Sequence, residues 1–200
     1  VEGFLQIETF GMMAPIMVML ATIAVAAGAI AGEENNRTMG LLLANPVSRS
    51  RVVAANTWTM VLFGVIVGFA TFAGTALGSL AAGLDMSIAN IAAACVLLSL
   101  VGIAGGALTL AITAGTGSKK AGIFGAIGVM AALHVLNSMG EISEKFEGVQ
   151  PLSPFYYYLG GDPLQNGMDW GHAAVLALMA AALIAISFPL FQRRDIRQHD

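Results

Sequence analysis

Long apolar stretches, each near 20 residues and separated by short polar segments, dominate this 200-residue chain. Five of them lack Asp, Glu, Lys and Arg in their central portions. None alternates apolar and polar residues with the period of two that a membrane β-strand requires. A bilayer core about 30 Å thick is crossed by about 20 helical residues. The pattern therefore predicts an all-α polytopic membrane protein with five transmembrane helices, at 10–31, 57–80, 91–114, 121–139 and 172–191.

Composition supports a chain embedded in a lipid bilayer. Hydrophobic residues make up 57% and charged residues 10%, whereas about 25% of a soluble domain is charged. This balance excludes a basic protein that binds nucleic acid and a disordered tail. The single cysteine, Cys95, cannot form an internal disulfide, so a disulfide-stapled secreted domain is excluded as well. We expect one transmembrane domain over 1–200.

The few charges are divided unequally between the segments that join the apolar stretches. Eight of the nine Lys and Arg residues lie in the segments 33–51, 115–120 and 192–200, which share one side of the membrane. The other side carries Lys145 and eight of the twelve acidic residues. The positive-inside rule then places the first side, with the C-terminus, in the cytoplasm.

Five spans and a cytoplasmic C-terminus place the start of the chain outside. The chain begins with Val1 rather than Met. We therefore expect an earlier span, which gives six in the native protein.

Glycines recur four residues apart within the predicted helices. Small residues at this spacing let helix backbones approach closely inside a membrane. Packing within the chain is the first interpretation, and a dimer seam is the alternative. The pairs are Gly28/Gly32, Gly64/Gly68, Gly74/Gly78 and Gly102/Gly106.

Catalytic and metal-binding motifs do not stand out. The segment 115–120 lacks the Gly before Lys of a phosphate-binding loop, and the three histidines are too scattered for a metal site. His134 and Asn137 are three residues apart in the fourth span, so they share a helix face. They contact either a substrate or the neighbouring backbone; with Thr22 and Met130 they form a candidate substrate path. The spans hold no carboxylate of the kind that proton- or sodium-coupled carriers use, so the energy for transport must come from elsewhere.

The outer loop 140–171 is expected to hold a short surface helix over 141–149. After it, four aromatic residues at 155–158 lie beside Pro151 and Pro154. Tyr and Trp rings suit the headgroup level of a bilayer, so interfacial anchoring is the first interpretation. A lid over an outward exit is the alternative.

The segment 33–51 is the most informative part of the chain. Glu33 and Glu34 suit the positive start of a short helix, Leu41–Leu43 form an apolar cluster, and Pro46 ends the element. The segment either lies on the lipid surface as an amphipathic turn or docks by its leucines into the groove of another protein.

Several motifs together resemble the ABC-2-type transporter permeases. The segment Ala31-Gly-Glu-Glu34, Thr38 and Leu41-Leu-Leu-Ala-Asn-Pro46-Val-Ser-Arg49 is similar to the cytoplasmic loop of that family. Leu152-Ser-Pro-Phe-Tyr-Tyr157 and Phe191-Gln-Arg-Arg-Asp-Ile196 also fit its pattern. Arg37 departs from the usual Gly, and Met39-Gly40 replace a common Leu-Glu. The family's six-span layout agrees with the missing first span.

The resemblance implies that the chain is the permease subunit of an exporter. The subunit itself is then not an enzyme. It lies in the plasma membrane of a bacterium or archaeon, pairs with a second permease subunit as a homo- or heterodimer, and binds no cofactor. ATP and Mg²⁺ belong to separate cytoplasmic ABC ATPase subunits. A stand-alone channel or carrier and a membrane scaffold remain the alternatives. The resemblance assigns coupling to the ATPase to Glu33, Glu34, Arg37, Thr38, Leu41, Leu42, Pro46 and Arg49.

Overall fold

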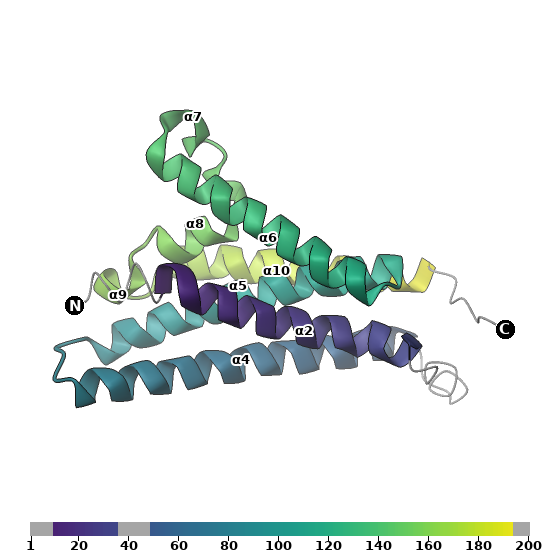
Figure 1. Ribbon diagram of the computed structural model, residues 1–200, viewed down its shortest axis with the longest axis horizontal. Coiled ribbons are helices and arrows are strands. Elements are labelled where there is room, and N and C mark those ends of the chain that lie inside the picture. The colour runs from purple at the N-terminus through teal and green to yellow at the C-terminus, as the bar shows by residue number, and fades with distance from the viewer. Residues whose placement is uncertain (1–9, 36–48, 194–200) are drawn as a thin grey trace.

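Five long helices make up most of the part of the chain that the structure describes (Figure 1). The computed structural model describes residues 10–35 and 49–193, and every regular element in these ranges is helical. All five predicted spans are confirmed, because each helix is long and apolar enough to cross a membrane. A π-helical turn over 10–13 precedes the first helix. The helices are α2 (Ala14–Asn35), α4 (Arg49–Ala81), α5 (Ile88–Thr116), α6 (Lys119–Ile142) and α10 (Trp170–Arg193).

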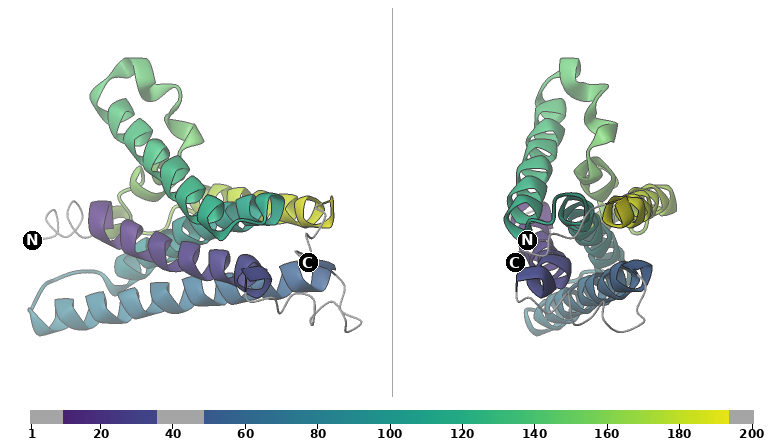
Figure 2. Two further views of the ribbon diagram at one scale, coloured as in Figure 1. Left: turned by 45° about the vertical axis from the view of Figure 1, so that its right-hand side comes forward. Right: turned by 90° about the vertical axis from the view of Figure 1, so that its right-hand side faces the viewer.

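The centre of the bundle is α5, which packs against α2, α4, α6 and α10 (Figures 1 and 2). In its most apolar window 72% of residues are buried, against 22% in the corresponding windows of α4, α6 and α10. The other helices therefore turn most of their apolar surface outward, as lipid-facing helices do.

Two of the glycine pairs create this close packing. A Cβ at Gly64 would lie 2.7 Å from Ile103 Cγ1, and one at Gly106 would lie 2.7 Å from Met60 Sδ. Gly102 faces Val18 and Gly68 faces Ser99 at even closer range. Packing within the chain is thus confirmed for Gly64/Gly68 and Gly102/Gly106. By contrast, nothing lies within 4 Å of a Cβ at Gly28, Gly74 or Gly78.

A tight turn joins α5 to α6. Gly117 adopts φ 68°, which a residue without Cβ tolerates, and its N–H donates to Thr113 O at 2.8 Å. Ser118 then caps α6 by accepting from the N–H of Ala121 at 3.2 Å. The turn places Lys119 and Lys120 at the end of the bundle where α10 finishes at Arg193.

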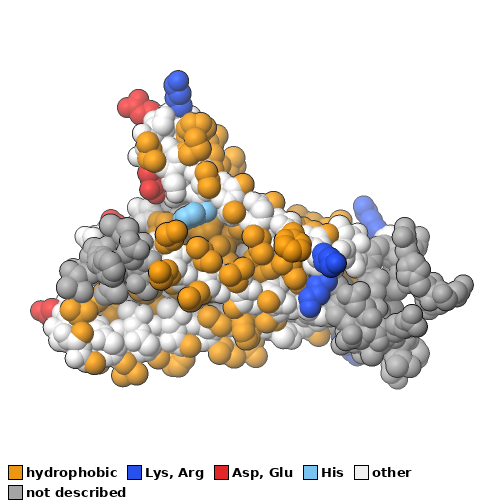
Figure 3. All heavy atoms as spheres, viewed as in Figure 1, with side chains coloured by type: hydrophobic (Ala, Val, Ile, Leu, Met, Phe, Trp, Pro, Cys, Tyr) orange, Lys and Arg blue, Asp and Glu red, His pale blue; other side chains and the backbone are white. Residues whose placement is uncertain are grey.

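The opposite end holds the acidic side chains. Glu141, Glu144 and Glu147 lie at and beyond the end of α6, while Asp85 follows α4. Figure 3 shows red side chains at this end, together with one blue side chain, and the other blue side chains towards the opposite end. We call the end with Lys119, Lys120 and Arg193 the basic end. The end with Asp85, Glu141, Glu144 and Glu147 is the acidic end.

Short helices close the acidic end between α6 and α10. There α6 leans away from the other long helices, and α7, which follows it, lies furthest from the rest of the bundle (Figures 1 and 2). The predicted surface helix over 141–149 is only partly right, since α6 continues to Ile142 and α7 is a single turn. The short helices are α7 (Glu144–Glu147), η2 (Gln150–Leu152), α8 (Pro154–Leu159) and α9 (Pro163–Asn166).

Candidate functional site

The predicted coupling segment 33–51 joins α2 to α4 along the chain. The backbone of α2 continues helically to Asn35, so Glu33 and Glu34 belong to its last turn. The expectation that these acids start a separate short helix is therefore wrong. Arg49 begins α4. The remaining residues assigned to coupling, Arg37, Thr38, Leu41, Leu42 and Pro46, lie outside the described residues.

Thr22, a candidate for the substrate path, lies where α2 meets α5. Its side chain is fully buried. Its Oγ1 lies 2.7 Å from Gly102 O, a shorter contact than the 3.0 Å to Val18 O in its own helix. The hydroxyl carries one proton, so we assign the donation to Gly102 O. Thr22 thus joins two helices by a hydrogen bond of the kind that polar side chains make inside membranes.

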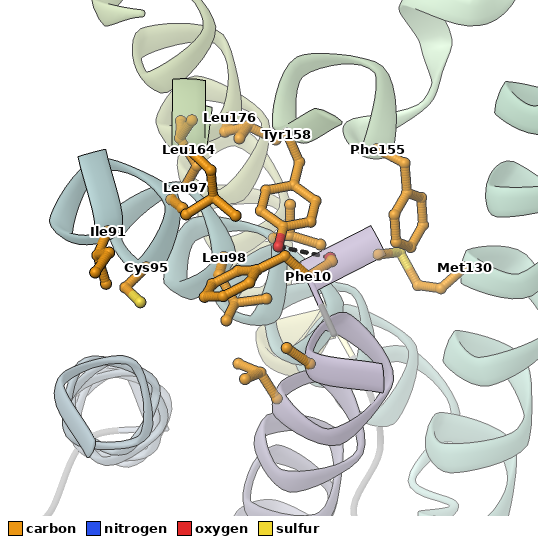
Figure 4. Packing of buried hydrophobic residues seen from close by; sticks show 14 residues of the cluster. Phe10, Ile91, Cys95, Leu97, Leu98, Met130, Phe155, Tyr158, Leu164 and Leu176 are labelled. Atoms are coloured by element: carbon orange, nitrogen blue, oxygen red, sulfur yellow. Dashed lines mark hydrogen bonds between the residues drawn. The ribbon is translucent and has the colours of Figure 1, made fainter. Parts of the chain in front are cut away.

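Met130, the second candidate, lies on α6 and faces α5. It is 3% exposed and belongs to the main apolar cluster. Its Cε would lie 3.8 Å from a Cβ at Gly105. Figure 4 shows it beside Phe155 of α8. Thr22 and Met130 are both packed in the bundle, and they face different neighbours.

His134 and Asn137 lie closer to the acidic end of α6 and face the short helices. The ring centroids of His134 and Phe155 are 4.7 Å apart in an edge-on arrangement. Asn137 is 2% exposed, and its Nδ2 donates to Glu141 Oε1 at 3.0 Å. Two buried atoms here, His134 Nδ1 and Asn137 Oδ1, have no hydrogen-bond partner. Each such atom costs about 1–3 kcal/mol.

The short helices are attached to α6 by hydrogen bonds to its carbonyl groups. Gln150 Nε2 donates to Asn137 O at 3.0 Å, and Ser153 Oγ donates to Leu133 O at 2.9 Å. Gly140 leaves the space in which the Gln150 side chain lies. η2 and α8 therefore cover part of the polar face of α6, where Asn137 is buried while the His134 side chain stays partly exposed.

The aromatic residues of α8 are placed differently from what the sequence predicts. Phe155 and Tyr158 are each 1% exposed and lie inside the bundle, so the interpretation as headgroup anchors is wrong for both. Tyr158 Oη donates to Phe10 O at 2.8 Å (Figure 4). Burial raises the pKa of the Tyr158 hydroxyl, which keeps it protonated as a donor. Helix α8 thereby links the start of the chain to the loop before α10.

The second contact of α8 is with the start of α10. The backbone N–H groups of Gly171 and His172 donate to Asp169 Oδ1 at 2.8 and 3.0 Å. The bond from His172 lowers the pKa of the Asp169 carboxyl. The His172 ring lies 5.9 Å from the ring of Tyr156 and 5.4 Å from that of Tyr157. These contacts fix α8 between α6 and α10.

Comparison with known proteins identifies the architecture. The sequence matches the family model for ABC-2 family transporter proteins over residues 3–196. The chain belongs to the ABC-2 family of transporter proteins. No curated protein matches this sequence. ABC-2 permeases are the membrane component of ABC-type transporters and are not themselves catalytic, and membership implies association with an ABC ATPase.

The sequence pattern did not predict the buried helix α8 of this ABC-2 permease, although two local signals indicate it. Ser153 followed by Pro154 is a typical start of a helix, because Ser caps the first N–H groups and Pro suits the first turn. Phe155 and Tyr158 are three residues apart, so a helix here turns both rings to one face. Six residues are too few to show a period, which is why composition alone favoured an interfacial position.

Replacing Tyr158 with Phe tests how firmly α8 holds the permease together. The change removes the hydroxyl that bonds Phe10 O and keeps the buried ring, so we expect a loss of about 0.5–1.5 kcal/mol in the free energy of unfolding. Thermal unfolding of the purified permease in detergent measures it. Tyr157→Phe, at a half-exposed position on the same helix, is the matched control. Equal melting temperatures for the two variants would show that the bond contributes nothing.

Proposed function

We propose that this chain is the permease subunit of an ATP-driven exporter that moves an amphipathic or hydrophobic substrate across the plasma membrane. The observation that carries the proposal is the family match over 3–196 on a bundle of five apolar helices. The permease works as a homo- or heterodimer with a second permease subunit. ATP and Mg²⁺ bind to the partner ATPase subunits.

Coupling to the ATPase runs through the segment 33–51. This segment joins α2 to α4, and both helices pack along α5. A push on the segment therefore acts on two helices that share one central neighbour. Since packed helices rearrange as rigid bodies, such a push reaches the acidic end without a continuous chain of polar contacts. Leu41 and Leu42 provide the apolar anchor for a groove on the ATPase.

The basic end faces the cytoplasm in this proposal. Lys119 and Lys120 at the start of α6 and Arg193 at the end of α10 support it, because short loops rich in Lys and Arg stay inside. The acidic end, with α7 and α8, then lies on the outer side. This orientation places the segment 33–51 where a cytoplasmic ATPase can bind it.

Labelling of single cysteines tests the orientation. In a Cys95→Ala background, we expect a membrane-impermeant maleimide to label Gly148→Cys in intact cells and Thr116→Cys only after the cells are permeabilised. Both positions are exposed, and a Cβ at Gly148 meets nothing within 4 Å. Labelling of Thr116→Cys alone in intact cells would reverse the proposed orientation.

The transport function itself is tested with the complex. We expect the permease to co-purify with an ATPase whose gene lies beside its own, and the complex in liposomes to hydrolyse ATP at a rate that amphipathic compounds increase. The mass of the complex distinguishes one permease species from two. An isolated permease that conducts or transports without ATP would contradict the proposal.

A further inference from the structure

We propose that the polar face of α6 near the acidic end binds the head group of a cationic amphiphile whose ammonium carries N–H donors. This inference rests on the proposed function, since it names the class of substrate that the permease moves. Three residues carry the site: His134, Asn137 and Glu141. They are spaced at three and four residues along α6, so their side chains form one stripe.

Asn137 decides which chemistry the stripe accepts. Its amide nitrogen donates to Glu141 Oε1 at 3.0 Å, so the opposite orientation of the amide would set two oxygens against each other. Asn137 Oδ1 is thereby fixed as an acceptor, and it is buried without a partner in a side chain that is 2% exposed. A carbonyl oxygen accepts hydrogen bonds and donates none. The missing partner must therefore be a donor.

His134 supplies a second unsatisfied atom one turn away. Its Nδ1 is buried and has no partner, while its ring packs edge-on against Phe155. A neutral imidazole protonated on Nε2 presents Nδ1 as an acceptor. In this tautomer both unpartnered atoms, His134 Nδ1 and Asn137 Oδ1, are hydrogen-bond acceptors. A single ammonium group carries several N–H donors and can therefore donate to both. The Phe155 ring adds an aromatic wall of the kind that attracts cations.

Charge at this end favours a cation over a neutral donor. Glu141 is exposed at the end of the stripe. It lies at the acidic end, where Lys145 is the one basic side chain among the described residues. Five further acidic residues of the described chain lie there: Asp85, Glu144, Glu147, Asp162 and Asp169. Cationic molecules are therefore concentrated at this end, and anionic ones are repelled.

The rest of α6 suits an alkyl tail. From the partly exposed His134 towards the basic end, α6 exposes apolar side chains, with Val129 44% and Phe124 71% exposed. Figure 3 shows apolar side chains gathered over this face of the bundle. A head group held at Asn137 would leave its tail along this surface, in contact with lipid. The geometry thus matches an amphiphile and not a small polar ion.

The test compares probes that differ in one feature each. Dodecylammonium and dodecyltrimethylammonium share chain and charge, but only the first has N–H donors, whereas dodecan-1-ol has a donor and no charge. Radiolabelled dodecylammonium is bound to the permease–ATPase complex in lipid nanodiscs without ATP, with empty nanodiscs subtracted. We expect unlabelled dodecylammonium to displace it at concentrations about tenfold lower than either other probe does. Equal displacement by dodecyltrimethylammonium or by dodecan-1-ol would overturn the proposal.

Variants locate the effect on α6. Asn137→Leu and Glu141→Gln should reduce the preference to less than about threefold. Ser138→Ala should keep it, since that hydroxyl donates to its own helix at His134 O. Glu141 is exposed, so Glu141→Gln keeps the test valid if Asn137→Leu fails to fold. Because no ATP is present, a complex that binds dodecylammonium selectively but never couples hydrolysis to transport contradicts the proposed function alone. An unchanged preference in both variants contradicts this site alone.

Discussion

Replacing Leu41 and Leu42 together with Asp is expected to separate the permease from its ATPase while leaving the helical bundle folded. Each leucine buried in a protein groove contributes about 1.5–3 kcal/mol, and a carboxylate in the same groove adds a desolvation cost. Losing 3 kcal/mol alone weakens association by more than about 100-fold. The bundle should be unaffected, because its described core is built from the five long helices, the turn before α2, and α8 and α9.

Co-purification measures the loss of association, and thermal unfolding of the permease alone measures the fold. Ser118→Asp is the control for negative charge at the same end of the bundle. Asp keeps the cap that Ser118 Oγ gives to the N–H of Ala121, so α6 should start as before. We expect this control to bind the ATPase normally.

Normal association and transport in the double variant would exclude a coupling role for the segment. An alternative is an amphipathic turn on the lipid surface, which also loses affinity when leucines become acidic. The two explanations differ in one respect. A lipid-bound turn would leave ATPase association intact and change only the thermal stability in liposomes.

The spans could be predicted from sequence because the bilayer imposes one simple requirement on every crossing segment. Each helix must present about 20 apolar residues, and these are visible without knowing any neighbour. The ends were less certain, as α4 begins at Arg49, where the predicted span begins at 57. Polar residues such as Asn56 and Arg51 remain helical there because the backbone bonds do not depend on the side chains.

The candidate site was predicted only in part, because its burial depends on pieces far apart in the chain. The pairing of His134 with Asn137 follows from helical spacing alone. That Phe155, Gln150 and Ser153 cover this face requires the return of the chain at α8, which no local pattern specifies. Thr22 was grouped with His134 by composition, yet its hydroxyl donates to Gly102 O of α5, whereas His134 packs against Phe155 of α8.

Replacing Gly102 with Leu should destabilise the bundle strongly. A Cβ at this position collides with Val18, which is 2% exposed and stiff because it is branched at Cβ. Relief requires α2 to move away from α5, and this movement also breaks the hydrogen bond from Thr22 to Gly102 O. Overpacking of this kind costs about 1–3 kcal/mol, so we expect a melting temperature lower by about 2–12 °C.

Gly74→Leu is the matched control for that variant. It makes the same exchange inside a helix, with the same gain in helix propensity, but nothing lies within 4 Å of a Cβ there. Its melting temperature should equal or slightly exceed that of the unaltered permease. If both variants melt alike, close approach of α2 to α5 at Gly102 does not limit stability. If Gly74→Leu alone is destabilised in the assembled transporter and not in the isolated permease, that glycine pair contacts the second subunit.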